Sequence, residues 1–171
     1  MKRLCALLAC LLPLSAFAHS PATGPEPEIR AVVEAFRTAI INKDKARFLG
    51  LFVAGPVTWQ SVRGDQPLSQ MRETDPQAPK VPLDAARNHL TFIDGIVARE
   101  ARVEEKFGEL RIDTDGDIAS VVFDYSFHVD GRETNHGDEA WQLVRTDDGW
   151  KIVAVIWSIN PARPAPADAA G

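Results

Sequence analysis

Apolar residues recur every three or four positions near the start of the chain, which is the spacing of an amphipathic helix. Ile29, Val33, Phe36 and Ile40 fall on one face of such a helix. The pattern predicts a helix over 28–41.

A second, shorter apolar stripe follows a break at Asn42. Asp44 stands where a helix N-cap is expected, and Gly55-Pro56 ends the pattern. The face of this second helix consists of Phe48, Leu51 and Phe52. The two helices are expected to form a helical hairpin.

The middle of the chain is less regular. β-branched and aromatic residues over 57–62 predict a short strand. Four prolines within 63–82 predict a long connection without secondary structure, which is either a lid or a disordered segment. Apolar residues at helical spacing predict a third helix from about Leu83 to Arg99, with Asp84 placed to cap its first turn.

Three Asp-Gly pairs divide the last third of the chain into strand-like runs. They are Asp115-Gly116, Asp130-Gly131 and Asp148-Gly149. Asp-Gly tolerates the positive φ angles of a tight hairpin, so the pattern predicts an antiparallel meander. The expected strands cover 102–113, 117–130, 136–146 and 150–159.

These elements predict a single α+β domain over 28–159, in which a curved antiparallel sheet wraps around three helices. The flanking segments 19–27 and 160–171 are rich in proline and alanine and lack large apolar residues. Such segments bury too little surface to order themselves, so both are expected to be flexible tails.

The first eighteen residues have the order of a secretory signal. Lys2-Arg3 precede an apolar stretch over 4–14, and Ala16-Phe17-Ala18 form a cleavage sequence. Cleavage after Ala18 predicts a periplasmic or secreted protein of about 153 residues. The apolar stretch is too short to span a bilayer, and Cys5 and Cys10, the only cysteines, leave with the signal.

Charge and motifs exclude several classes of partner and cofactor. The net charge is −5, and without Lys2 and Arg3 it is 17 − 24 = −7. An acidic chain without a basic run argues against nucleic acid and anionic membranes as partners. No phosphate loop, dinucleotide fingerprint or Gly-x-Ser-x-Gly occurs, and the scattered histidines predict no metal site, so no cofactor is expected.

The order of the elements resembles the nuclear transport factor 2-like superfamily, a curved cone shared by SnoaL-like proteins and ketosteroid isomerase. Three segments carry the resemblance: 42–52, with its Asp before an apolar stripe; 115–119, a hairpin into a long strand; and 137–158, which is similar to the final hairpin of the SnoaL-like branch. The resemblance implies the fold over about 28–159. It implies no single activity, because the superfamily includes isomerases, hydratases, cyclases and binding domains.

Candidate residues for catalysis are Asp124, His128 and Asp44. Asp124 and His128 share one face of the strand 117–130, opposite to the apolar Phe123 and Tyr125. They lie on the wet outer face if the apolar set covers the helices. If curvature turns the polar set inward, the Asp becomes a base and the His an acid.

The ketosteroid isomerase relatives use an Asp base together with a Tyr and a protonated Asp. This chain offers Asp44, Asp124 and its single tyrosine, Tyr125, which do not fit that triad residue by residue. Asp44 suits a helix cap as well as a base.

Aromatic residues provide a candidate ligand site. Trp59, Tyr125, Trp141 and Trp157 either line an apolar pocket or fill the core.

Three functions agree with the sequence. The first is an exported protein that binds a small apolar or amphipathic ligand in the cone. The second is a general acid–base isomerase or hydratase of the same fold. The third is an interaction module in which the outer sheet face, with Val122, Ser126, His128, Gln142 and Val144, forms a homodimer.

Overall fold

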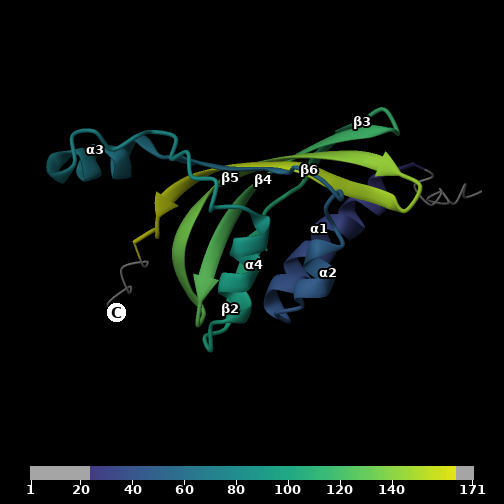
Figure 1. Ribbon diagram of the computed structural model, residues 1–171, viewed down its shortest axis with the longest axis horizontal. Helices are drawn as coiled ribbons and strands as arrows, with labels where there is room; N and C mark the ends of the chain where they lie inside the picture. Colours follow the sequence, from purple (N-terminus) through teal and green to yellow (C-terminus); the bar gives the residue numbers. More distant parts are fainter. Residues whose placement is uncertain (1–23, 165–171) are drawn as a thin grey trace, which may run out of the picture.

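A six-stranded sheet curves around three of four helices in the computed structural model, which describes residues 24–164 (Figure 1). The strand order is β1-β6-β5-β4-β2, and β3 also pairs with β4. The strands are β1 (Thr58–Arg63), β2 (Val103–Phe107), β3 (Arg111–Thr114), β4 (Ile118–Val129), β5 (Arg132–Thr146) and β6 (Gly149–Pro161). The helices are α1 (Glu26–Ile41), α2 (Lys45–Leu49), α3 (Asp65–Thr74) and α4 (His89–Val97).

The helical hairpin at the start of the domain is confirmed. The backbone N–H of Arg47 donates to the Asp44 carboxylate at 3.0 Å, so Asp44 is the N-cap of α2. The buried face of α1 carries Ile29, Val33, Phe36, Ala39 and Ile40. These side chains pack against the concave side of the sheet and form the core with it.

The hairpins at the Asp-Gly pairs are confirmed as well. Gly116, Gly131 and Gly149 all have positive φ, and Asp130 joins Gly131 with φ of 49°. These turns connect β3, β4, β5 and β6 into antiparallel neighbours. The sheet is not wholly antiparallel, however, because β1 pairs with β6 in parallel.

The predicted strand 102–113 is two strands, β2 and β3, which meet β4 in registers that differ by one residue. The break lies at Gly108, whose backbone N–H donates to the Asp124 carbonyl at 2.8 Å. A Cβ on Gly108 would lie 2.1 Å from the Asp124 carboxylate, so a larger residue would require the Asp124 side chain to turn away. The extra residue shifts the alternation, and Ile112 rather than Arg111 then packs on the core.

The connection 63–82 is not structureless, because it contains α3. Pro67 falls in the first turn of that helix, where proline costs no internal hydrogen bond. Leu68 and Ala78 are buried, and the Arg72 guanidinium donates to the Ala78 carbonyl at 3.1 Å. Figure 1 shows α3 beyond one end of the sheet, away from α4.

The third predicted helix is shorter than expected, because α4 begins at His89 rather than near Leu83. The Asn88 side chain accepts hydrogen bonds from the backbone N–H groups of Leu90 and Thr91, at 3.0 and 3.1 Å. Thr91 completes a capping box with the Asn88 backbone. Asp84 instead closes a turn before the helix by accepting from Ala86.

Several sequence predictions fall outside the described residues. The signal over 1–18 and most of both tails belong to this group. Within 24–164, α1 already begins at Glu26 and β6 continues to Pro161. None of the helices in this part of the chain has the length and apolar character needed to cross a bilayer.

Replacing Asn88 by alanine is expected to lower the free energy of unfolding by about 1 kcal/mol, because it removes the two side-chain bonds that cap α4. Denaturant unfolding measures the loss. Asp84→Ala is the matched control, since it deletes the turn bond to Ala86 and the loose, exposed ion pair with Arg87 but leaves the helix cap in place. An equal loss in the control would contradict the assignment of the cap to Asn88.

Candidate functional site

A cavity of about 390 Å³ lies between the concave side of the sheet and α4. Its size is within the range of small-molecule sites. Its lining comes from α1, β1, β2, β4, β5, β6 and the segments on either side of α4: Phe36, Trp59, Arg87, Phe92, Arg99, Glu105, Tyr125, Phe127, Asn135, Glu139, Trp157 and Ile159. We call this space the inner hollow.

A second space of about 290 Å³ adjoins the inner hollow and opens toward solvent; we call it the mouth hollow. The two share Trp59, Arg87, Phe92, Trp157 and Ile159 as walls. The mouth hollow adds polar groups from β1 and from the start of α4: Gln60, Ser61, Asp84, Asn88 and Thr91. A ligand in the inner hollow can therefore extend along these shared walls into the mouth hollow.

Two glutamates line the inner hollow although they are almost wholly buried. Glu105 is 4% exposed and Glu139 is 5% exposed. Glu105 lies on β2 and Glu139 on β5, so β4 runs between them in the sheet. Each occupies an inward position of its strand, because Glu105 alternates with Val103 and Phe107, and Glu139 precedes Trp141 by two residues.

The two carboxyl groups lie close enough for each to affect the pKa of the other. Burial raises the pKa of Glu105 well above its usual range, and the charge of Glu139 raises it further. Burial also raises the pKa of Glu139, to about 7, against the opposing effect of hydrogen bonds from Trp141 and Glu105. The Trp141 indole donates to Glu139 Oε2 at 2.6 Å. Both carboxyls therefore hold their protons to higher pH than an exposed glutamate does, and the proton lost near neutrality belongs to the pair.

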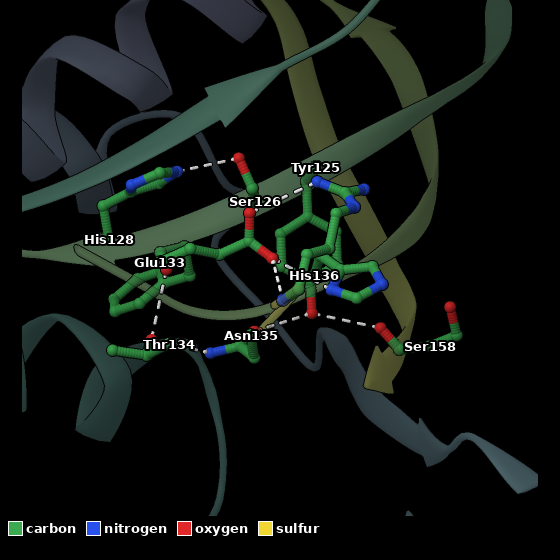
Figure 2. Close-up of polar contacts among 10 residues, drawn as sticks. Tyr125, Ser126, His128, Glu133, Thr134, Asn135, His136 and Ser158 are labelled. Carbon is green, nitrogen blue, oxygen red and sulfur yellow. Dashed lines mark hydrogen bonds and ion pairs between the residues drawn. The ribbon is translucent and has the colours of Figure 1, made fainter. Parts of the chain in front are cut away.

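Tyr125 adds a neutral hydroxyl to the same wall. Its Oη lies 3.0 Å from Asn135 Oδ1 and 3.0 Å from the carbonyl oxygen of Ser158 (Figure 2). Burial raises the pKa of Tyr125, and the nearby Glu139 and Glu105 raise it further. A phenol and a neutral carboxylic acid beside a titratable carboxylate are the groups that proton transfer to and from carbon requires.

The aromatic residues predicted for a ligand site are largely brought together. Trp59, Tyr125 and Trp157 line the inner hollow. Trp59 contacts Trp157 with ring centroids 5.2 Å apart. Trp141 is fully buried behind the wall and reaches the site only through its N–H to Glu139.

The residues predicted for catalysis lie elsewhere. Asp44 caps α2, and Asp124 is exposed on the outer face beside Gly108. His128 is on the same outer face, where its Nε2 lies 2.9 Å from the Ser126 hydroxyl (Figure 2). None of the three lines the inner hollow.

Glu105 and Glu139 were the residues that sequence reasoning missed. The signal was present in the alternation, since each carboxylate stands in phase with the apolar side of its strand. For Glu105 the signal was blurred by the shift at Gly108, which changes the inward phase between β2 and β3.

Among residues 24–164, no three His, Cys, Asp or Glu side chains are grouped so that they could hold a metal ion.

Solved structures resemble this chain in fold at low sequence identity. A cystatin-like protein from Novosphingobium aromaticivorans, described as nuclear transport factor 2-like, has a TM-score of 0.56 and 14% identity; the match covers 85% of this chain and 86% of that one. The chain has the nuclear transport factor 2-like fold. The cone predicted from the sequence is thereby confirmed.

Two further structures with the nuclear transport factor 2-like fold carry candidate activities. A candidate dehydratase from Streptomyces avermitilis has a TM-score of 0.56 and 17% identity, over 81% of this chain and 96% of that one. A candidate ketosteroid isomerase from Shewanella frigidimarina has a TM-score of 0.51 and 20% identity, over 79% and 98%. No protein-family model and no curated protein sequence matches this chain.

The buried glutamates give the stability a definite pH dependence. Their folded-state pKa values lie above the usual 4.5, so the folded protein binds more protons than the unfolded chain between about pH 4.5 and the folded-state values. The free energy of unfolding is therefore expected to fall as pH rises through this window, by about 3 kcal/mol from the raised pKa of Glu139 alone.

Denaturant unfolding of the wild type and of the Glu105→Gln/Glu139→Gln double variant measures this term. His89, whose pKa burial lowers, contributes a slope of opposite sign in both proteins, so the difference between the two curves is the readout. Parallel curves from pH 4 to pH 8 would show that the two carboxyls ionise normally in the fold.

Proposed function

We propose that the inner hollow binds a small, mainly apolar carbonyl compound and moves a proton on it, as an isomerase or a dehydratase does. The observation that carries the proposal is the buried Glu105–Glu139 pair facing an aromatic cavity. A carboxylate that titrates near neutrality, next to a carboxylic acid that stays protonated, provides a base and an acid on one wall.

In the proposed reaction, Glu139 removes a proton from the carbon next to the ligand's carbonyl. The electron pair of that C–H bond forms the enolate, whose oxygen accepts a hydrogen bond from the Glu105 carboxylic acid or the Tyr125 hydroxyl. If the ligand has a β,γ double bond, the enolate is a dienolate, and return of the proton from Glu139 to the γ-carbon moves the double bond into conjugation and completes an isomerisation. In a dehydration, the enolate instead expels a β-hydroxyl, which leaves as water with a proton from an acid of the site.

The similar structures support both reaction classes only as analogies. One is named a candidate ketosteroid isomerase and another a candidate dehydratase. Their identities to this chain, 20% and 17%, carry the fold rather than the chemistry. The proposal therefore rests mainly on the buried Glu105–Glu139 pair.

A second candidate function is ligand binding without chemistry. The aromatic rings favour it, because Trp59, Phe92, Phe127 and Trp157 supply a large apolar surface of the kind that holds flat ligands. The same rings would serve an enzyme, so the behaviour of a bound ketone's protons separates the two functions.

We also propose that the protein is exported and works as a homodimer. Lys2-Arg3, the apolar stretch over 4–14 and Ala16-Phe17-Ala18 support export with cleavage after Ala18. The outer sheet face supports the dimer, since Val122, Ala140 and Ile156 follow one another across β4, β5 and β6. Ile156 remains 46% exposed there, which a second copy of this face would cover.

Glu139→Gln is expected to lower the rate of proton exchange on a bound ketone by about 100-fold or more, the range that a general base contributes. The substrate is acetonaphthone in D₂O, and NMR follows the loss of its methyl protons. In the wild type the rate is expected to rise with pH through about 7, because only ionised Glu139 accepts a proton.

Asp124→Asn is the matched control, because it removes an exposed carboxylate from the outer face, and it should leave the rate unchanged. Trp141→Phe removes a hydrogen bond that lowers the pKa of Glu139, so its rate profile is expected to shift to higher pH. Wild-type protein that binds acetonaphthone without exchanging its protons would reject the enzyme in favour of the binding protein.

Native mass spectrometry of the protein recovered from the periplasm tests export and assembly together. We expect a subunit mass that begins at His19 and a complex of two subunits. Val122→Arg, which buries a charge in the proposed interface, should give the same subunit mass as a monomer. An uncleaved cytoplasmic chain would refute export, and a wild-type monomer at micromolar concentration would refute the dimer.

A further inference from the structure

Both hollows hold charged groups of either sign, because Asp84 lines the mouth hollow and Arg87 and Arg99 line the inner one. Glu105 and Glu139 line only the inner hollow, whereas Arg87 stands where the inner and mouth hollows meet. Arg99 also lines the inner hollow, from the other end of α4. A ligand that extends through both spaces would meet carboxyl groups at one end and the Arg87 guanidinium at the other.

A neutral carbonyl suits the glutamate wall of the inner hollow better than a carboxylate does. Glu139 carries a negative charge once the pH exceeds about 7, and it is almost wholly buried. A carboxylate placed beside it would add a second buried anion, which costs several kcal/mol unless a cation compensates it. A carbonyl group meets no such penalty, because it brings no charge into the buried site.

The mouth hollow, by contrast, suits an anion. The Arg87 guanidinium has only a loose partner there, since its Nε lies 3.6 Å from the Asp84 carboxylate and both side chains are more than half exposed. An exposed pair of this length contributes little stability and leaves guanidinium donors available. Gln60, Ser61, Asn88 and Thr91 surround the same space with neutral polar groups.

The wall between the two ends is aromatic. Trp59 lies 5.2 Å from Phe92 and 5.2 Å from Trp157, measured between ring centroids, and all three line both hollows. Rings arranged in this way favour a flat, apolar body between the two polar ends of a ligand.

We propose that the ligand is an amphipathic keto acid: a carbonyl end lies at the glutamates, a flat apolar body lies along Trp59, and a carboxylate lies at Arg87. The inference rests on the proposed function, because the carbonyl end is assigned from the acid–base pair. It goes further by giving the ligand a charge, an orientation and a recognition residue.

Three probes of one ring skeleton test the charge preference: acetonaphthone, naphthoic acid, and the acetylnaphthoic acid whose two substituents lie on opposite rings. Isothermal titration calorimetry on the mature protein measures their affinities. The acetylnaphthoic acid is expected to bind about tenfold more tightly than acetonaphthone, the equivalent of one charge-assisted hydrogen bond. Equal affinities, or no binding of any probe up to about 1 mM, would overturn the inference.

Two substitutions with opposite expected effects identify the residue that gives the preference for a carboxylate. Arg87→Gln should abolish the tenfold advantage, whereas Asp84→Asn should increase it a few-fold by removing the competing carboxylate. Arg111→Gln, an exposed arginine on β3, is the matched charge control and should change nothing. All three positions are exposed, so the variants are expected to fold. An advantage that survives Arg87→Gln but disappears in Arg99→Gln would overturn the assignment to Arg87.

The two proposals can fail separately. Glu139→Gln should retain the preference for the carboxylate and lose proton exchange on acetonaphthone. Exchange without a carboxylate preference would reject the keto acid and leave the enzyme standing. A carboxylate preference without exchange would support the ligand class and reject proton transfer.

Discussion

The contact between Phe36 and Trp141 holds the cone together, because it joins α1 to the middle of the sheet. Their ring centroids lie 4.6 Å apart, and both side chains are almost fully buried. Phe123 and Phe107 extend the contact along the sheet, and Phe48 extends it to α2. Aromatic pairs add about 0.5–1.5 kcal/mol each beyond the area they bury, so this cluster fixes where the helices sit on the curve.

The same tryptophan connects the core to the candidate site. Trp141 points its indole N–H at Glu139, so one residue both fills the core and holds the carboxylate that lines the inner hollow. Its neighbour Phe36 also lines that hollow. The boundary between the packed core and the cavity therefore runs through single side chains, and the position of the carboxylate depends on how well the aromatic cluster packs.

The buried pair of glutamates gives the fold no structural advantage over a pair of apolar residues. Two carboxyls without a cation between them are costly to bury, and one must keep its proton to remain there. A fold that needed only stability would place leucine or methionine at these positions. A costly polar pair next to an open apolar cavity is the arrangement in which strain and function commonly coincide.

Turns and helix caps that depend on neighbouring residues in the sequence were predicted in detail. The Asp-Gly turns place glycine at positive φ, and Asp44 caps the next helix, because each interaction involves residues within four positions of one another. Prediction failed where two local signals competed, as with Asp84 and Asn88 for the start of α4. It also failed where one buried leucine anchored a helix in a proline-rich segment, as Leu68 does in α3.

The sequence by itself determined the fold class, the hairpins and the inward face of each regular strand. Only the tertiary structure decided which inward residues share a cavity. Glu105 and Glu139 are far apart in the chain and meet because β4 lies between their strands and the sheet curves. Strand order, register shifts such as that at Gly108, and curvature are set by packing between distant segments, and a one-residue shift exchanges the two faces of a strand. For that reason the sequence indicated the outer-face Asp124 and His128 as catalytic candidates and missed the two glutamates that line the site.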